Sequence, residues 1–565
     1  MKIAVEGCCH GELDKIYETV AYLEKCNNVK VDLLLICGDF QAVRNKSDLE
    51  TMAVPPKYRK MNTFWKYYSG NKTAPILTVI IGGNHEASSY LQELPYGGWV
   101  APNIYYMGYA GVIQCGGIRI AGLSGIYKGK DYHRGHFEHP PYTEETKRSC
   151  YHVRNIEVFR LKQIKKPIDI FISHDWPRGI YDYGNVRALL SKKAFFRSEV
   201  ESGTLGSVAA EELLHHVKPK YWFAAHLHCK FAALVTHKSE NEDTKETKFL
   251  ALDKCLPKRK FLQIIDIPSD SSKLVELELD PEWLAILKST NHLLTLSRSN
   301  CYMPGVGSPN RYDFTPTSEE VEAVSEDFGQ IFKIPENFER TAEPYDPKTK
   351  ERCSPQMTIN PQTTLLCEML ELTDPFAVFC GKQKPANYEI TIQSPASDVG
   401  SLDDSALVDD SDLTDSTIDL TTINSTLEMS NNPDEISIDD LDGDEDSEVS
   451  IAKDASPINQ EQPSLSLPPP KCNMEEADCS QLTSNLDDSS FEFKNSLPGQ
   501  ILFVEECTEK LNASMESDSS VSSGKRSASA DTDTLSSMTG DESSPVKMKK
   551  LKRRNQALYA NNEES

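Results

Sequence analysis

The sequence predicts a layered α/β protein that is followed by a long acidic segment, and three observations predict it. Short apolar runs rich in β-branched residues recur through the first half of the chain, each with the length of a buried strand. An amphipathic helix pattern stands between the first two runs, which is the alternation typical of α/β proteins. The balance of charge then changes sign along the chain, which separates a folded part from a solvated part.

The predicted elements follow one another in a regular order. Residues 13–25 have apolar side chains at helical spacing, between the first two strands. The predicted strands are Lys2–Val5, Val31–Cys37, Ile76–Ile81, Ile118–Leu123, Ile168–Ser173, Tyr221–Ala225 and Phe261–Ile267. Further helices are predicted from Pro281, with proline at the first position, and over Leu365–Leu372.

Residues 124–154 interrupt this alternation with a stretch dense in Tyr, His, Lys, Arg, Gly and Pro. A connection of this length inside a compact domain is usually functional or disordered. We expect a catalytic domain over residues 1–237 that contains this loop, a smaller domain over 238–380, and a disordered tail over 381–565.

The net charge of −26 belongs to the second half of the chain. Residues 1–300 hold 40 basic and 34 acidic side chains, whereas residues 301–565 hold 20 and 52. Residues 385–452 contain 19 acids and no Lys or Arg, a composition that does not support a packed core. Acidity of the whole chain therefore does not exclude a nucleic-acid partner for the first half.

The sequence also makes predictions about location. The basic cluster at residues 547–554 predicts a nuclear-import signal read by an import receptor, the alternative being a solvated charge run. We expect a nuclear protein that also shuttles to the cytoplasm. No apolar run is long enough for a membrane span or a signal peptide, and the scattered 15 Cys favour reduced thiols.

Five short polar motifs stand out because each directly follows a predicted strand. They are Cys8-Cys9-His10-Gly11, Gly38-Asp39, Gly82-Gly83-Asn84-His85-Glu86, Ser173-His174-Asp175 and Ala225-His226-Leu227-His228. Ligand sites of layered α/β folds form at the carboxyl ends of strands, so we expect these motifs to meet. A lone Gly-Asp is an ordinary turn and a lone buried His is usually structural, so the ordered set carries the inference.

The side chains of these motifs suit a metal centre. Imidazoles, one carboxylate that can bridge two ions, one amide oxygen and one thiol are available, from His10, His174, His226, His228, Asp39, Asn84 and Cys8. Seven donors are too many for one tetrahedral ion and suit two ions about 3.5–4 Å apart.

The ordered set resembles the calcineurin-like metallophosphoesterases, whose pattern runs Asp-x-His, Gly-Asp, Gly-Asn-His-Asp/Glu, His and Gly-His-x-His. Two positions depart from it: Cys8 stands where that family usually has Asp, and Ala225 where it has Gly. Cys8 in this position, with the segments 38–45, 52–58, 94–106 and 151–155, is similar to the RNA lariat debranching enzymes. The resemblance covers residues 1–290 and, more loosely, residues up to 380.

This resemblance implies a four-layer α/β/β/α sandwich with a smaller C-terminal extension. It implies a metal-dependent hydrolase of the 2′–5′ phosphodiester at the branch point of excised introns, acting in intron turnover. It also implies that loop 124–154 recognises branched RNA. Basic side chains can pair with phosphates there and aromatic ones can stack on bases, the candidates being Tyr127, Lys128, Tyr132, Arg134, Tyr142 and Arg154.

A mechanism follows as a hypothesis. One divalent ion would be held by His10, His228 and Cys8, the other by Asn84, His174 and His226, with Asp39 shared. His85 would protonate the leaving 2′-oxygen as general acid, and Glu86 would orient His85. The resemblance implies Fe²⁺, Zn²⁺ or Mn²⁺. A thiolate at Cys8 favours Zn or Fe over Mg, and a second interpretation leaves Cys8 without a bond to metal.

Two other functions remain open. A protein Ser/Thr phosphatase or another dinuclear phosphodiesterase would share this chemistry. Those phosphatases, however, carry Val-Asp-Arg-Gly after Gly-Asp, and Phe40-Gln41-Ala42-Val43-Arg44 stands here instead. A non-catalytic scaffold on the same fold would have lost ligands, whereas only the position of Cys8 departs.

Overall fold

A computed structural model describes residues 1–238, 244–348 and 354–384 of the chain. The predicted disordered tail beyond residue 384 and the basic cluster at 547–554 lie outside the described residues. Among the described helices, none is long and apolar enough to cross a membrane.

The first of two sheets has six strands in the order β12-β1-β2-β3-β5-β4. Strands β1, β2, β3 and β5 run parallel, and β12 and β4 pair antiparallel at the two edges. The strands are β1 Lys2–Glu6, β2 Leu33–Ile36, β3 Leu77–Ile80, β4 Gly98–Ala101, β5 Ile104–Tyr106 and β12 Leu262–Asp266.

The second sheet has seven strands in the order β10-β11-β9-β8-β7-β6-β13. Its centre, β11, β9, β8 and β7, is parallel, and the outer strands pair antiparallel. The strands are β6 Ala110–Cys115, β7 Ile118–Leu123, β8 Ile170–Ser173, β9 Tyr221–Ala224, β10 Phe231–His237, β11 Lys245–Ala251 and β13 Leu277–Leu279.

Alternate side chains of each strand divide the molecule into four layers. In β1, Ile3 and Val5 pack with Ile170 and Ile172 of β8 in a core between the two sheets. Ala4, between them, faces the opposite side and packs against helix α1 (Leu13–Asn27). Because successive side chains of a strand point to opposite faces, the order of layers is α/β/β/α, as expected.

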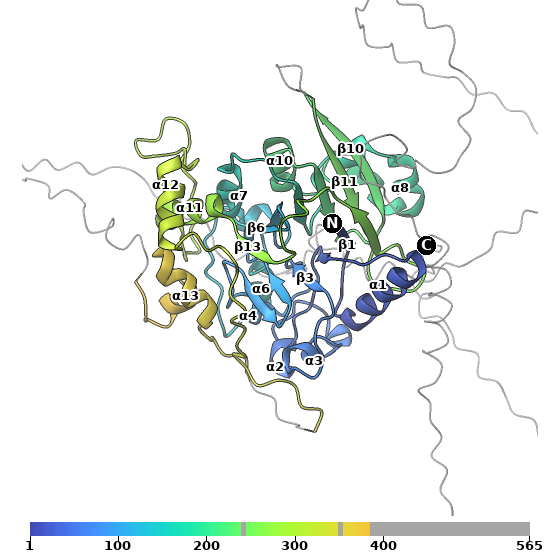
Figure 1. Ribbon diagram of the computed structural model, residues 1–565, viewed down its shortest axis with the longest axis horizontal. Coiled ribbons are helices and arrows are strands. Elements are labelled where there is room, and N and C mark those ends of the chain that lie inside the picture. Colours follow the sequence, from blue (N-terminus) through green and yellow to red (C-terminus); the bar gives the residue numbers. More distant parts are fainter. Residues whose placement is uncertain (239–243, 349–353, 385–565) are drawn as a thin grey trace, which may run out of the picture. The chain divides into compact units, whose positions relative to one another are not determined.

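Helices cover the outer face of each sheet. The second sheet is covered by α7 (Asn155–Lys162), α10 (Val208–Val217) and the later helix α11 (Pro281–Thr290) (Figure 1). Phe171 and Trp222 of this sheet belong to one core with residues of these three helices. The other α-helices are α2 Lys46–Leu49, α3 Trp65–Tyr68, α4 Ser88–Leu91, α5 Gly129–Tyr132, α6 Glu144–Ser149, α8 Val186–Lys192, α9 Arg197–Glu201, α12 Ser318–Asp327, α13 Pro361–Leu370 and α14 Pro375–Phe379.

All the strands predicted from the sequence are present, with ends that differ from the prediction by at most two residues. The boundary expected at residue 237 falls inside the β10–β11 hairpin. Beyond it, β11 and β13 join the second sheet and β12 joins the first. The strands β11, β12 and β13 therefore complete the two sheets, and the added helices α11, α12 and α13 pack together next to them (Figure 1).

Candidate metal centre and active site

The five predicted motifs lie at the carboxyl ends of parallel strands. Cys8 and His10 follow β1, Asp39 follows β2, and the segment 84–86 follows β3 in the first sheet. His174 follows β8, and the pair 226–228 follows β9, in the second sheet. Because the sheets lie face to face, their strand ends bring all five motifs to one place.

The backbone turns sharply at these strand ends. Four of the candidate ligands have left-handed backbone angles, with φ of 45° at His10, 48° at Asp39, 61° at His226 and 48° at His228. Non-glycine residues adopt this conformation at a cost and keep it only where the surroundings fix it. These turns let both His226 and His228, two positions apart, contribute to the same site.

One group of donors consists of Cys8, His10, Asp39 and His228, whose ligand atoms all lie within 4.8 Å of one another. The Nε2 atoms of His10 and His228 are 3.0 Å apart, and His10 Nε2 lies 3.6 Å from Asp39 Oδ2. Cys8 is fully buried, and its sulfur accepts a hydrogen bond from the backbone N–H of His226 at 3.1 Å.

The second group forms on the other carboxylate oxygen of Asp39. His174 Nε2 lies 3.3 Å from Asp39 Oδ1 and 3.2 Å from the Asn84 side-chain oxygen. The ring of His226 stands 5.0 Å from that of His174. The Nδ1–H of His174 donates to the Cys37 carbonyl at 2.7 Å, so that a neutral His174 turns the lone pair of Nε2 towards this group.

The atoms that face one another fit two divalent cations. Around His174 an imidazole lone pair, an amide oxygen and a carboxylate oxygen converge, and around His10 two imidazoles, a carboxylate and a thiol do so. Electron-rich atoms at such distances repel one another unless a proton or a cation lies between them. Histidine nitrogens, cysteine sulfur and carboxylate oxygens are also the donors that transition-metal ions prefer.

The electrostatics agree with this fit. Burial alone would raise the pKa of Asp39, but the facing His174, His85 and His10 hold that pKa well below its ordinary value. Burial, with His174 as neighbour, lowers the pKa of His226 to about 3, so that His226 is a neutral donor. Burial, reinforced by the charge of Asp39, raises the pKa of the Cys8 thiol well above its ordinary value. A Cys8 thiolate therefore needs a cation beside it.

Two glycines allow the loops that carry Asp39, Asn84 and His174 to approach one another closely. Gly38 has φ of +105°, and a Cβ built there would lie 2.3 Å from His174 Nδ1. A Cβ on Gly83 would lie 2.2 Å from Asp39 Oδ1. The glycines beside Asp39 and Asn84 are therefore needed for the two sheets to share one site.

His85 lies beside Asp39 and His10 and is partly exposed. Its side chain keeps 17% of its exposure, and its Nδ1 lies 3.5 Å from Asp39 Oδ2. The rings of His85 and His10 are 5.3 Å apart. This is the position from which a side chain can reach a substrate atom beside the metal ligands.

Glu86, which the sequence predicts to orient His85, lies behind the donor groups and is fixed by the backbone. Its carboxylate accepts the N–H groups of Phe40, Gln41 and Gly83 at 2.7, 2.8 and 2.9 Å. Burial, followed by repulsion from Asp39, raises the pKa of Glu86 to about 7. Glu86 thus joins the loop that carries Asp39 to the loop that carries Asn84.

Loop 124–154 is attached directly to the metal loops. The backbone N–H of Gly125 donates to the Gly82 carbonyl at 2.8 Å, and that of Tyr127 donates to the Asp175 carboxylate at 3.2 Å. Asp175 follows the candidate ligand His174, so the loop and the second donor group share one support.

The predicted RNA-contacting residues of this loop fall into two classes. Tyr127, Tyr132 and Arg134 are partly exposed, and Arg134 pairs with Asp131 at 2.8 Å. Lys128 is mostly buried, and the Tyr142 hydroxyl donates to the Gln92 side chain at 2.5 Å. Arg154 is fully buried and pairs with Glu138 at 2.6 Å, so this arginine holds the loop together instead of facing solvent.

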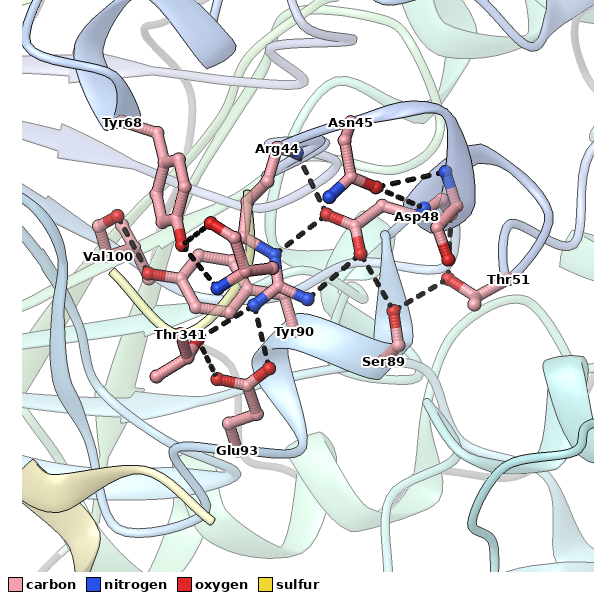
Figure 2. A network of polar contacts seen from close by, with 12 residues as sticks. Arg44, Asn45, Asp48, Thr51, Tyr68, Ser89, Tyr90, Glu93, Val100 and Thr341 are labelled. Carbon is pink, nitrogen blue, oxygen red and sulfur yellow. Dashed lines mark hydrogen bonds and ion pairs between the residues drawn. The ribbon is translucent and has the colours of Figure 1, made fainter. Parts of the chain in front are cut away.

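A buried arginine fixes the loop that follows Asp39. Arg44 bonds Asp48 through two nitrogens at 2.8 and 2.9 Å and Glu93 at 2.7 Å, and its guanidinium lies 4.0 Å from the Tyr90 ring centre (Figure 2). Arg44 also donates to Thr341 Oγ1 at 2.9 Å. A segment far along the chain therefore closes over the loop of Asp39.

Sequence reasoning missed several residues behind the site. Glu6 is fully buried, neither of its carboxylate oxygens has a hydrogen-bond partner among the residues that the structure describes, and burial raises its pKa well above the ordinary value. Asn62 donates to the His10 carbonyl at 2.9 Å and supports that turn. An acid inside the apolar first strand was a visible signal for Glu6, whereas nothing near Asn62 in the sequence marks it.

Comparisons with known proteins agree with this arrangement. Residues 1–230 match the family model "Calcineurin-like phosphoesterase", and residues 244–375 match "Lariat debranching enzyme, C-terminal domain". The chain is 55% identical to "Lariat debranching enzyme A" of Xenopus laevis over 83% of this chain and 86% of the relative. It is 48% identical to "Lariat debranching enzyme" of Homo sapiens over 99% and 98%. The enzyme of that name from Arabidopsis thaliana is 52% identical over 66% and 86%.

Proposed function

The chain belongs to the lariat debranching enzymes, within the calcineurin-like phosphoesterases, and from its site we propose how it acts on branched RNA. It is a metal-dependent phosphodiesterase that hydrolyses the 2′–5′ bond at the branch point of excised intron lariats. The observation that carries the proposal is that two groups of metal donors meet on the two oxygens of Asp39.

Two divalent cations would occupy these groups. Cys8, His10 and His228 would hold one, Asn84, His174 and His226 would hold the other, and Asp39 would touch both. When bound, such ions supply Lewis acidity that activates a water and offsets charge on the phosphate. The fully buried sulfur of Cys8 favours Fe²⁺ or Zn²⁺ over Mg²⁺, with Mn²⁺ as the third candidate.

The protein side chains do the rest of the chemistry. His85, which is partly exposed beside Asp39, donates a proton to the 2′-oxygen as the bond from that oxygen to phosphorus breaks. Asp39 Oδ2 lies 3.5 Å from His85 Nδ1, on the side of the ring that faces the donor groups. Glu86 keeps both loops in place, so that the proton donor and the donor atoms retain their spacing.

The test of this function compares three substrates on metal-reconstituted protein. These are a 2′–5′ branched oligonucleotide, a linear 3′–5′ RNA and a phosphopeptide. We expect turnover of the branched substrate alone. Equal cleavage of branched and linear RNA would defeat the assignment, and turnover of the phosphopeptide alone would favour a protein phosphatase. Absence of turnover with every metal would favour a scaffold.

A nuclear location is a further part of the proposal. It rests on the basic cluster 547–554 in the sequence, which an import receptor could read, and on introns being excised in the nucleus. Replacing the basic residues of 547–554 by Gln should move a fluorescently tagged chain to the cytoplasm. An unchanged nuclear signal would reject this role for the cluster.

A further inference from the structure

We propose that a second basic surface, on the Cys8 and His228 side of the metal centre, binds the phosphates of one RNA arm that leaves the branch point. The second basic surface consists of Lys192, Lys230, Lys258, Arg259 and Lys260. The proposal rests on the proposed function, because a branched RNA has three arms and loop 124–154 lies on the other side of the centre.

Backbone contacts place this surface beside the first donor group. The backbone N–H of Cys8 donates to the Asp253 carbonyl at 3.2 Å, and that of Cys255 donates to the Cys8 carbonyl at 3.1 Å. The N–H of Gly7 donates to the Phe261 carbonyl at 3.0 Å. Residues 253–261 therefore run directly alongside the Cys8 turn, and the three cations at 258–260 lie within this segment.

Two other segments bring their cations to the same place. Lys230 comes two positions after His228, and its Nζ donates to the Gln263 side chain at 3.1 Å. Leu189 and Phe196, which flank Lys192 and Lys193 in the chain, belong to the same core as Cys229, the residue between His228 and Lys230. Three separate stretches of the chain thus converge on one rim of the metal centre.

The basic side chains of this surface are exposed enough for a polyanion to reach them from solvent. Lys192, Lys258 and Lys260 are exposed, and Lys230 and Arg259 are partly exposed. Arg259 pairs with Asp253 at 3.5 Å through a side chain that keeps 32% of its exposure. The Asp253 carboxylate keeps only 9% of its exposure, so Arg259 stays paired with it and the exposed Lys192, Lys258 and Lys260 are the cations that meet the phosphates.

Apolar side chains stand among these cations. Phe195 is 36% exposed, and the Lys193 ammonium lies 5.6 Å from its ring centre. Leu256, between the basic residues, is 41% exposed. Proteins usually hold single-stranded nucleic acid in this way: cations pair with the phosphates, and an exposed aromatic ring beside them stacks on a base.

The other side of the centre is already occupied by loop 124–154, which is anchored at Gly82 and Asp175. That loop lies beside the second donor group, whereas the second basic surface lies beside the first. A branch point at Asp39 would therefore have separate supports for two arms. One support alone would leave the orientation of the branch less well fixed.

The experiment uses the full chain with matched substrates, a minimal branched trinucleotide and branched RNAs in which one arm at a time is extended. The test variant is the triple Lys192→Gln/Lys258→Gln/Lys260→Gln. The control is Lys25→Gln/Lys30→Gln/Lys220→Gln, three exposed lysines near the amino ends of the strands. The readout is the ratio of kcat/KM for each extended substrate to that for the trinucleotide, as a function of salt.

We expect the test triple to lower this ratio about tenfold for one of the three arms and to reduce its logarithmic salt slope by about 2, since three phosphate contacts are lost. The control triple should leave the ratio unchanged. Phe195→Ala should lower the ratio for the same arm. A photoreactive base in that arm should crosslink to residues 253–262.

Other outcomes overturn the proposal. If the test and control triples give the same ratio of kcat/KM values, the second basic surface does not bind an RNA arm. Cleavage of the trinucleotide in that case would still support the proposed function. Failure of the wild-type chain on every branched substrate would reject the function itself. A carbodiimide crosslink between Lys258 or Lys260 and the acidic residues 385–452 that persists with saturating RNA would assign the surface to that segment instead.

Discussion

At the scale of single residues, Asp39 links the two halves of the site. One of its oxygens faces His10 and His85, and the other faces His174. The order of motifs in the sequence allowed this carboxylate to be predicted as the shared ligand, because Gly-Asp after a strand places an acid at a strand end. The hydrogen-bond partners of Glu86 could not be predicted in that way. They are backbone groups, and side-chain identity does not reveal them.

His85 gives the first prediction. His85→Ala should lower kcat on branched RNA by about 10²–10⁴-fold, the usual contribution of a general acid, and should leave the bound metal unchanged. A phosphodiester with a p-nitrophenolate leaving group needs no proton, so its turnover should fall far less. Loss of metal in this variant would make His85 a ligand, and equal losses on both substrates would reject the role of proton donor.

Glu86 gives the second prediction. In Glu86→Gln an NH₂ group replaces one of two oxygens that accept three backbone N–H groups, so at least one buried donor loses its partner. We expect a loss of about 1–3 kcal/mol in the free energy of unfolding, together with a lower kcat. Glu50→Gln, on a half-exposed carboxylate, is the matched control. Equal stability of the two variants would contradict the inference that Glu86 joins the loop of Asp39 to the loop of Asn84.

At the scale of elements, parallel strands and their carboxyl ends position the chemistry. The strands predicted from the sequence are buried runs of apolar residues. Strands β4, β5, β6, β10, β11 and β13 were not predicted; β5 and β13 have only three residues, and exposed side chains alternate with buried ones along β10. Their places are set by pairing with neighbours distant in sequence, which local pattern does not reveal.

The buried Arg44 network gives the third prediction. Arg44→Met would leave Asp48 and Glu93 buried without their cation, and we expect a loss of about 3–5 kcal/mol in the free energy of unfolding. Arg59→Met breaks an exposed pair with Glu50 and should cost less than about 1 kcal/mol. Urea denaturation of both variants measures the difference. Equal losses would show that the network does not fix the loop after Asp39.

At the scale of the whole molecule, chain order and spatial units do not coincide. Residues after 237 supply an edge strand to each sheet and a further strand, β11, inside the second. The boundary at residue 237 was predicted because the strand and helix patterns in the sequence become weaker beyond it. They become weaker because the strands there are partly exposed. The two sheets therefore take strands from both sides of residue 237.

Two truncations give the fourth prediction. A chain that ends at residue 384 should unfold cooperatively and should keep the kcat for a branched trinucleotide, because every candidate ligand and both sheets are retained. A chain that ends at residue 237 lacks β11, β12 and β13 and should be insoluble or molten. Near-ultraviolet circular dichroism distinguishes the two. A folded, active chain 1–237 would contradict the shared fold.

The central claim is that both donor groups act together through Asp39, and a metal titration of the debranching rate tests it most directly. Metal-free protein should gain activity until two equivalents of Mn²⁺ or Zn²⁺ are bound per chain, with little activity at one. Asp39→Asn should lower both the plateau and the stoichiometry. A full rate at one bound equivalent, or an unchanged titration in Asp39→Asn, would contradict the claim.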